Sequence, residues 1–294
     1  MIMRLSNAAR FFDKDPICDG YSSLPLFFGQ FTSYDGSKQD GTFSRKRTLS
    51  LAPDITLPAR HVVLAGPDRW ILGDPNLDSF QGADMRLTIK CKKCTDSYNF
   101  LTPGQAALRA TGATSAYAFT EYLKDTVNST TNSEYDPQYK VTMAITESPF
   151  DGMFLRSATN LFHVRSLYKE AEGFWLLTCD EISTAGGLGW QAGAANLAGG
   201  EVSVSFPTTG AYDPITDSFG VATSTTTGIL MDRYKLYDLR TQTDPLTKAG
   251  DTTLIVAKSA VTPVAGQTVN CPDTWRIQSA TEYQDAWSLH LRRA

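Results

Sequence analysis

The feature of this sequence that most restricts its fold is a pattern that occurs three times. Each copy consists of a short alternating segment that opens on an aromatic residue, a polar connection, and a second alternating segment. The aromatic openers are Trp70, Phe162 and Trp275, and the first and third share the lead-in Pro-Asp-x-Trp. Similarity of this kind within one chain is typical of proteins built from repeated structural units.

Each copy is predicted to form a β-hairpin with one buried face. Apolar side chains alternate in the second segments, which places them on one side of a strand because successive strand residues point to opposite sides. The predicted buried faces are Met85, Leu87 and Ile89 in the first copy, Trp175, Leu177 and Cys179 in the second, and Trp287, Leu289 and Leu291 in the third.

A lone hairpin cannot bury its own face, so each copy needs further strands. Alternating segments at 43–51, 140–146 and 229–236 precede the three hairpins, and 60–64 and 254–257 supply two more. Short strands with Gly/Pro turns predict a mainly β fold: two or three small β-barrel or sandwich units with short helical and Gly/Ala-rich insertions. The alternative is one large jelly roll or sandwich in which the similarity of the hairpins is accidental.

The pattern divides the chain into four parts. We expect an N-terminal β-barrel unit in 1–100, a middle insertion plus a weaker β unit in 101–182, a Gly/Ala/Thr-rich insertion in 183–228 and a C-terminal β-barrel unit in 229–294. A short helix is predicted after Thr102, because Pro103 is tolerated in the first turn of a helix.

Charge and hydropathy exclude several classes of protein. The 294 residues carry 27 Lys and Arg against 31 Asp and Glu, a net charge of −4, which does not suit a nucleic-acid coat or a polybasic membrane binder. The strongest apolar runs are four residues long, far short of the roughly 20 that a membrane helix needs. The opening residues do not resemble a signal peptide, and the cysteines are odd in number, so we expect a soluble protein made in a reducing compartment.

The residues that could support catalysis do not form a recognisable constellation. His61, His163 and His290 each lie in a predicted strand, where alternation can place them on the solvent face, and no nucleophile elbow is present. The acidic pairs Glu170/Glu172 and Asp180/Glu181 fall in predicted turns or at strand ends, where solvated charge is expected. We therefore predict no catalytic residue and no enzyme activity.

Metal and cofactor sites are not predicted either. Cys91 and Cys94 have the spacing of half a zinc site, but Cys179 and Cys271 are isolated and no second ligand pair follows. We therefore expect that these two cysteines mark the end of a strand and a free thiol. Replacing either cysteine by serine should have almost no effect on folding. The Gly-rich segment 186–200 lacks the Lys and Ser/Thr of a phosphate-binding loop.

Two tight basic clusters remain, at 45–47 and 292–293. They could meet phosphates or an acidic partner surface, although alternation puts Arg45 and Arg47 on one strand face, which is usually solvated. Because no catalytic constellation is found, the sequence favours a binding or structural protein over an enzyme.

The segments 45–95 and 228–294 resemble the small β-barrel head-completion and stopper proteins of tailed bacteriophages, and 138–182 does so weakly. The resemblance lies in a basic-to-apolar strand, a proline turn, the strand around RHVVLAGPDRWIL, a closing strand of the type MRLTIK, and the ending SLHLRR at 288–293. This chain is two to three times longer than such proteins and repeats the barrel.

The resemblance implies a structural virion protein of the head–tail connector, neck or tail tube, part of the channel for DNA passage. It implies a ring-forming homo-oligomer with six- or twelve-fold symmetry, contacts with portal and tail proteins, no membrane, and DNA only in non-specific transit. Such a protein would be made in the host bacterial cytoplasm and reside in the virion. The alternative is a carbohydrate- or receptor-binding β-module of a virion or cell surface, with Trp190 and the tyrosines as a stacking platform.

Overall fold

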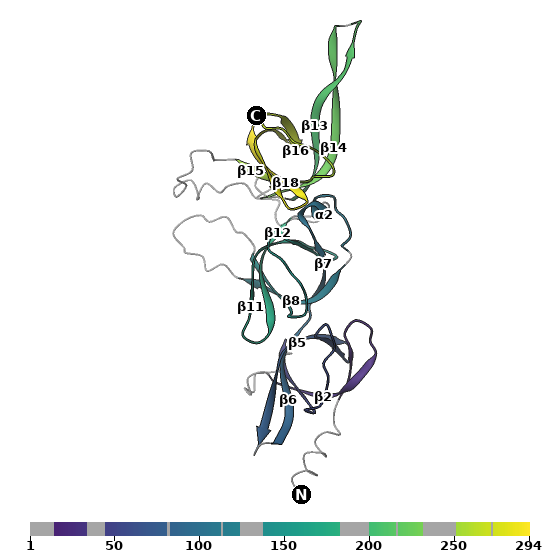
Figure 1. Ribbon diagram of the computed structural model, residues 1–294, viewed down its shortest axis with the longest axis vertical. Helices are drawn as coiled ribbons and strands as arrows, with labels where there is room; N and C mark the ends of the chain where they lie inside the picture. Colours follow the sequence, from purple (N-terminus) through teal and green to yellow (C-terminus); the bar gives the residue numbers. More distant parts are fainter. Residues whose placement is uncertain are drawn as a thin grey trace, which may run out of the picture.

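A computed structural model describes residues 15–33, 45–80, 83–112, 114–123, 138–182, 200–215, 217–231, 251–271 and 273–294. These residues form three closed six-stranded barrels, in which neighbouring strands run antiparallel. The barrels follow one another along the long axis of the molecule in chain order (Figure 1). The predicted mainly β fold of small barrel units is confirmed, and the single jelly roll is excluded.

The first barrel consists of β1 (Asp15–Asp19), β2 (Pro25–Ser33), β3 (Lys46–Leu51), β4 (Val62–Ala65), β5 (Asp68–Phe80) and β6 (Ala83–Lys93). The second consists of β7 (Asp96–Leu101), β8 (Ser115–Leu123), β9 (Gln138–Ala144), β10 (Phe154–Arg156), β11 (Leu161–Lys169) and β12 (Phe174–Ile182). The third consists of β13 (Gly200–Asp213), β14 (Ser218–Leu230), β15 (Thr252–Ala257), β16 (Thr268–Cys271), β17 (Asp273–Tyr283) and β18 (Ala286–Arg293).

All three barrels share one strand order. The first strand pairs with the second, the second with the third, the third with the sixth, the sixth with the fifth, the fifth with the fourth, and the fourth closes on the first. In the third barrel, Ser205 and Asn270 form the closing pair. The internal repeat is therefore threefold, and it includes the middle unit.

The three predicted hairpins are the fifth and sixth strands of the barrels, and each fifth strand carries an irregularity at the same place. The register shifts after Leu72, after Val164 and after Ile277, two residues beyond the aromatic opener in every copy. Each shift inserts one extra residue, but the β5–β6 hairpin is longer than the other two and pairs out to Phe80 and Ala83, so the alignment of Met85 with Trp175 and Trp287 is wrong by two residues. Pairing with the third strand makes Leu87, Ile89 and Cys91 equivalent to Trp175, Leu177 and Cys179.

Each barrel has its own core of inward-facing side chains. Trp70 packs with Leu49 and Ile89 in the first barrel, Phe162 packs with Val141 and Leu177 in the second, and the third is built around Trp275 and Leu289. The clusters are separate from one another, as expected for three units that each bury the faces of their own strands.

Three boundaries differ from the sequence-based expectation. The range 183–228 is not wholly an insertion, because β13 and most of β14 lie in it and begin the third barrel. Residues 101–182 form most of a complete barrel. Of the strand expected at 229–236, Ile229 and Leu230 are the end of β14, and 232–236 lie outside the described residues. β15 is equivalent to β3 rather than to β4.

The expected helix forms as α2 (Pro103–Ala107), with Pro103 in its first turn and Thr102 as its N-cap. Thr102 and Gln105 form a reciprocal capping box, which satisfies backbone N–H groups at the helix start. The helix lies between the second and third barrels (Figure 1).

Candidate functional site

Apolar side chains that point outward from the barrels join the first barrel to the second. Val62 and Ile71 of the first barrel pack with Phe119, Ala144 and Phe174 of the second, and all five are buried. Outward positions of a small barrel are ordinarily solvated, so burial on both sides of these strands marks a permanent contact between barrels.

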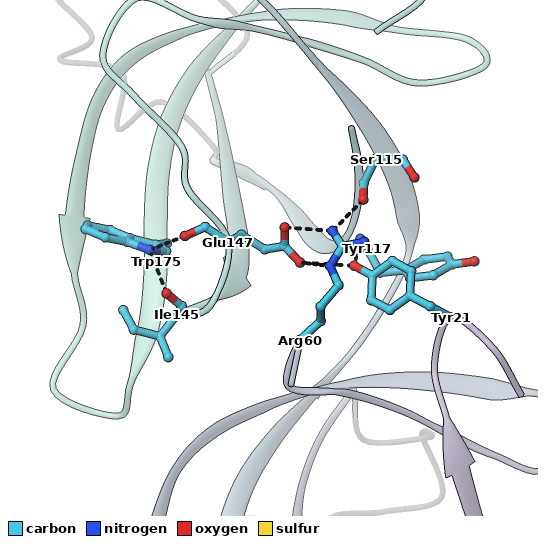
Figure 2. Close-up of polar contacts among 7 residues, drawn as sticks. All are labelled: Tyr21, Arg60, Ser115, Tyr117, Ile145, Glu147 and Trp175. Atoms are coloured by element: carbon cyan, nitrogen blue, oxygen red, sulfur yellow. Dashed lines mark hydrogen bonds and ion pairs between the residues drawn. The ribbon is translucent and has the colours of Figure 1, made fainter. Parts of the chain in front are cut away.

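An ion pair between a half-buried arginine and a buried carboxylate lies beside this apolar contact (Figure 2). The Arg60 guanidinium donates to both carboxylate oxygens of Glu147, at 3.1 and 2.8 Å, and also to the Ser115 carbonyl oxygen at 2.7 Å. The Tyr21 hydroxyl donates to the same carboxylate at 3.1 Å, and its ring lies 3.8 Å from the guanidinium carbon. Burial opposes the charged form of Arg60, but the hydrogen bonds and charge of Glu147 raise its pKa above the ordinary value.

The turn between β11 and β12 fixes the first junction at a second place. Glu172 accepts from Lys90 at 2.5 Å and Glu170 accepts from Lys92 at 2.8 Å, while the Asp74 N–H donates to the Glu172 carbonyl oxygen at 2.8 Å. The expectation that Glu170 and Glu172 are solvated is therefore wrong. These carboxylates hold one barrel against the next.

The second junction uses the equivalent surface of the third barrel. By strand pairing, Ile229 is equivalent to Phe119 and Ala286 to Phe174, and both are buried against residues of the second barrel. In the β17–β18 turn, the Asp285 carboxylate accepts from the Thr102 hydroxyl at 2.5 Å and the Gly104 N–H at 2.8 Å. Both junctions thus combine an apolar centre with charged or polar contacts at the fifth-to-sixth strand turn.

Sequence reasoning missed the junction residues Arg60, Glu147, Tyr21 and Asp285. None of them belongs to a motif, and Arg60 and Glu147 are 87 residues apart. The apolar part did leave a signal, because Val62 at the junction is followed directly by Val63 in the barrel core. Consecutive apolar residues in a strand indicate that both of its faces are covered.

The histidines do not come together and do not share one environment. His61 lies just before β4, with a left-handed backbone (φ 48°), and His290 in β18 lies 2.9 Å from an Asp251 carboxylate oxygen. His163 points outward, between the core residues Phe162 and Val164, but it is half-buried there. Its ring lies 4.9 Å from that of Phe154, and its Nδ1 atom is buried with no hydrogen-bond partner among the described residues. Burial, followed by the charge of Arg165, lowers the pKa of His163 to about 4.

Protonation of His163 is expected to make the protein less stable in acid. Between pH 6.5 and about 4 the unfolded chain binds a proton at this histidine and the folded chain resists it, so the free energy of unfolding falls as the pH falls. In His163→Gln, the melting temperature should depend less steeply on pH over this window. Comparing the melting temperatures of wild type and variant at pH 8, where the histidine is neutral in both the folded and unfolded states, isolates the effect of the substitution on packing. If the melting temperature of the variant depended on pH as steeply as that of wild type, His163 would not be the group responsible.

Cys91 and Cys94 lie in different environments. Cys91 points into the first barrel's core and is fully buried, whereas Cys94 follows β6 beside the first junction. Burial raises the pKa of both thiols, that of Cys94 to about 12, which disfavours the reactive thiolate. A serine hydroxyl at 91 would lie among apolar side chains, at a cost of about 1–3 kcal/mol, so replacement there is not expected to be neutral.

The remaining charged candidates interact with side chains of their own barrels. Arg47 lies 5.3 Å from the centre of the Trp70 ring, and Arg292 donates to both Asp251 carboxylate oxygens at 3.0 and 2.9 Å. Asp180 is buried and pairs with Arg165. The expectation that this carboxylate is solvated is wrong, because its partner across the strand pair covers it.

Within the described ranges, no group of three or more His, Cys, Asp or Glu side chains is placed to hold a metal ion. No helix among the described residues is long and apolar enough to cross a membrane. Trp190, on which the carbohydrate-binding alternative rests, lies outside the described residues.

With the geometry in place, the chain was compared with known proteins. No family model, curated protein or solved structure matches it.

Proposed function

We propose that this chain is a structural protein of a tailed-bacteriophage virion, at the head–tail connector, neck or tail tube. The observation that carries the proposal is the row of three equivalent barrels, held by two junctions that each combine buried apolar contacts with hydrogen-bonded carboxylates. A row of this kind sets a fixed distance between its ends, which is a mechanical property and suits a building element.

Three further features support the proposal. The resemblance of the repeated unit to head-completion barrels points to the same place in a virion. The net charge of −4 suits a channel that must let DNA pass, because fixed cations along a lumen would retain phosphates. The projecting β13–β14 hairpin offers backbone and side chains to neighbouring subunits (Figure 1).

The proposed assembly is a homo-oligomeric ring or tube that contacts portal and tail proteins, with no catalytic role. Electron microscopy of the full-length protein over a range of concentrations tests it, together with antibody labelling of the virus particles that carry it. We expect rings or tubes, and labelling at the junction of head and tail. A strict monomer that binds glycans on an array and is absent from the particles would replace the proposal with the carbohydrate-binding alternative.

A further inference from the structure

The two outer faces of the row can be compared with the faces that dock at the junctions, because all three barrels share one strand order. At the first junction, Val62 and Ile71 of the first barrel pack with Phe119 and Phe174 of the second. The equivalent positions form two outer faces, which we name the β16–β17 face (Thr268 and Arg276) and the β2–β6 face (Gln30 and Arg86). Neither face contributes a residue to the two junction clusters.

The β16–β17 face is polar where the first barrel is apolar. Strand pairing places Thr268 opposite Arg276, and the equivalent pair in the first barrel is Val62 opposite Ile71. The valine and the isoleucine are buried, whereas the threonine and the arginine are exposed. In the second barrel, His163 takes the position of the arginine, and burial lowers its pKa to about 4, so it is uncharged at neutral pH. Of the three copies, only the one on the outer face carries a charge at this position.

The β2–β6 face shows the same exchange at the other end of the row. Gln30 stands at the position of Phe119, because both pair with the third strand in the same register. Arg86 stands at the position of Phe174, at the start of the sixth-strand pairing with the third strand. Gln30 and Arg86 are exposed, and Arg86 pairs with Asp78 at the barrel surface. Polar side chains thus replace the two aromatic ones that fill the first junction.

Residues that cannot form an ion pair stand on the outer faces where Arg60 and Glu147 stand at the first junction. Ile55 takes the position of Glu147, since the N–H groups of both donate to the carbonyl oxygen three residues earlier. Gly266 takes the position of Arg60, because it precedes the start of β16 by two residues, as Arg60 precedes that of β4. The outer faces therefore differ from the first junction in its polar contact as well as in its apolar centre.

Two copies stacked end to end in the geometry of the first junction would bring Arg276 toward Arg86, because the residues at their positions belong to one buried cluster there. Both guanidinium groups would lose hydration, and their like charges repel each other. Phe28, which is 64% exposed, stands at the position of the half-buried Tyr117 and would add an apolar contact at the edge. Burial of this one side chain returns less free energy than the desolvation of two charges costs.

We propose that Arg86 and Arg276 prevent a further barrel from docking on either outer face, so that copies of this chain do not stack end to end. Polar outer faces on the terminal units are the usual device that keeps a row of repeats from associating. The inference goes beyond the proposed function and does not depend on it. In the proposed ring or tube, it requires neighbouring copies to meet through the sides of their barrels.

Two variants of the full-length protein install the residue types of the first junction, one at each outer face. Gln30→Phe/Arg86→Phe changes the β2–β6 face, and Thr268→Val/Arg276→Ile changes the β16–β17 face. Each variant alone should assemble like wild type, because its changed face meets an arginine on the next copy. An equimolar mixture should form end-to-end pairs at least roughly a hundredfold more tightly than wild type does, by sedimentation velocity, with particles of doubled length in electron micrographs.

Each variant alone is the matched control for non-specific association, since it exposes the added apolar side chains without a matching face. Circular dichroism melts verify folding, and Arg86→Met with Arg276→Met provides a milder pair, expected to associate in the same way, if a double variant is unfolded.

The inference is overturned if the mixture pairs no more tightly than wild type, or if either variant alone forms end-to-end rows. Wild-type tubes built from rows joined end to end would also overturn it, while supporting the proposed function. Absence of the chain from virus particles would reject the proposed function and leave this inference standing.

Discussion

Replacing Arg60, whose side chain is 38% exposed, by alanine is expected to destabilise the junction between the first two barrels by about 1–3 kcal/mol, because the Glu147 carboxylate loses its charged donor. The substitution leaves the Glu147 carboxylate, whose side chain is 4% exposed, with the Tyr21 hydroxyl and without its cation. Removal of one member of a buried pair costs more than the pair contributes, because the remaining charge is desolvated. Denaturant unfolding followed by hydrogen exchange should show both the lost stability and faster exchange at the junction.

Two further variants separate this explanation from a general loss of surface charge. Arg86→Ala removes a pair with Asp78 whose side chains are 56% and 35% exposed, so its effect should stay below about 1 kcal/mol. The double variant Arg60→Met/Glu147→Leu removes both charges and should recover much of the stability lost in Arg60→Ala. Equal losses in the single and double variants would contradict a desolvated carboxylate as the cause.

Replacing Gly152 by alanine is expected to disrupt the junction between the second and third barrels, at a cost of about 2–5 kcal/mol. Gly152 has φ +76°, and a Cβ atom built on it would lie 1.6 Å from the Tyr283 hydroxyl oxygen, which is far inside van der Waals contact. The tyrosine ring, which packs against the buried apolar residues of this junction, would have to move. Hydrogen exchange around α2 and the β17–β18 turn should rise, while the first barrel keeps its protection.

Gly66 provides the control for backbone strain alone. It also has a left-handed backbone, with φ +58°, but a Cβ atom there meets nothing within 4 Å. Gly66→Ala should therefore cost about 1–2 kcal/mol from strain, without loss of the second junction. If the two alanine variants were equally destabilised, the collision with Tyr283 would not be the reason.

Local alternation in the sequence was sufficient to predict the fifth and sixth strands of all three barrels. The side-chain period of a strand is two, so the buried faces can be identified wherever the outer face is polar. Trp275 and Leu289 are found in the third core as this argument predicts. Only the first copy was displaced by two residues, since its hairpin is longer than the other two and the added length leaves no separate mark in the hydrophobic pattern.

The strands of the β13–β14 hairpin were not predicted, because Ser, Thr and Gly are frequent in its sequence and interrupt the alternation of apolar and polar residues. Their pairing depends on the barrel, where Val204 and Phe206 enter the third core and fix the register. The sequence favoured an insertion there since small polar residues are equally common in loops.

By itself the sequence determined the fold class, the presence of repeated barrel units and many of the inward-facing residues, because these follow from short-range periodicity; that the middle unit is a full third barrel came from the structure. Only the tertiary structure decided how the barrels are joined. An outward strand residue has the same local pattern whether it faces water or another barrel, and the partners are distant along the chain: Thr102 and Asp285 are 183 residues apart. Short-range periodicity carries no information about contacts between positions so far apart. The two junctions could therefore be identified only from the packing of the folded barrels against one another.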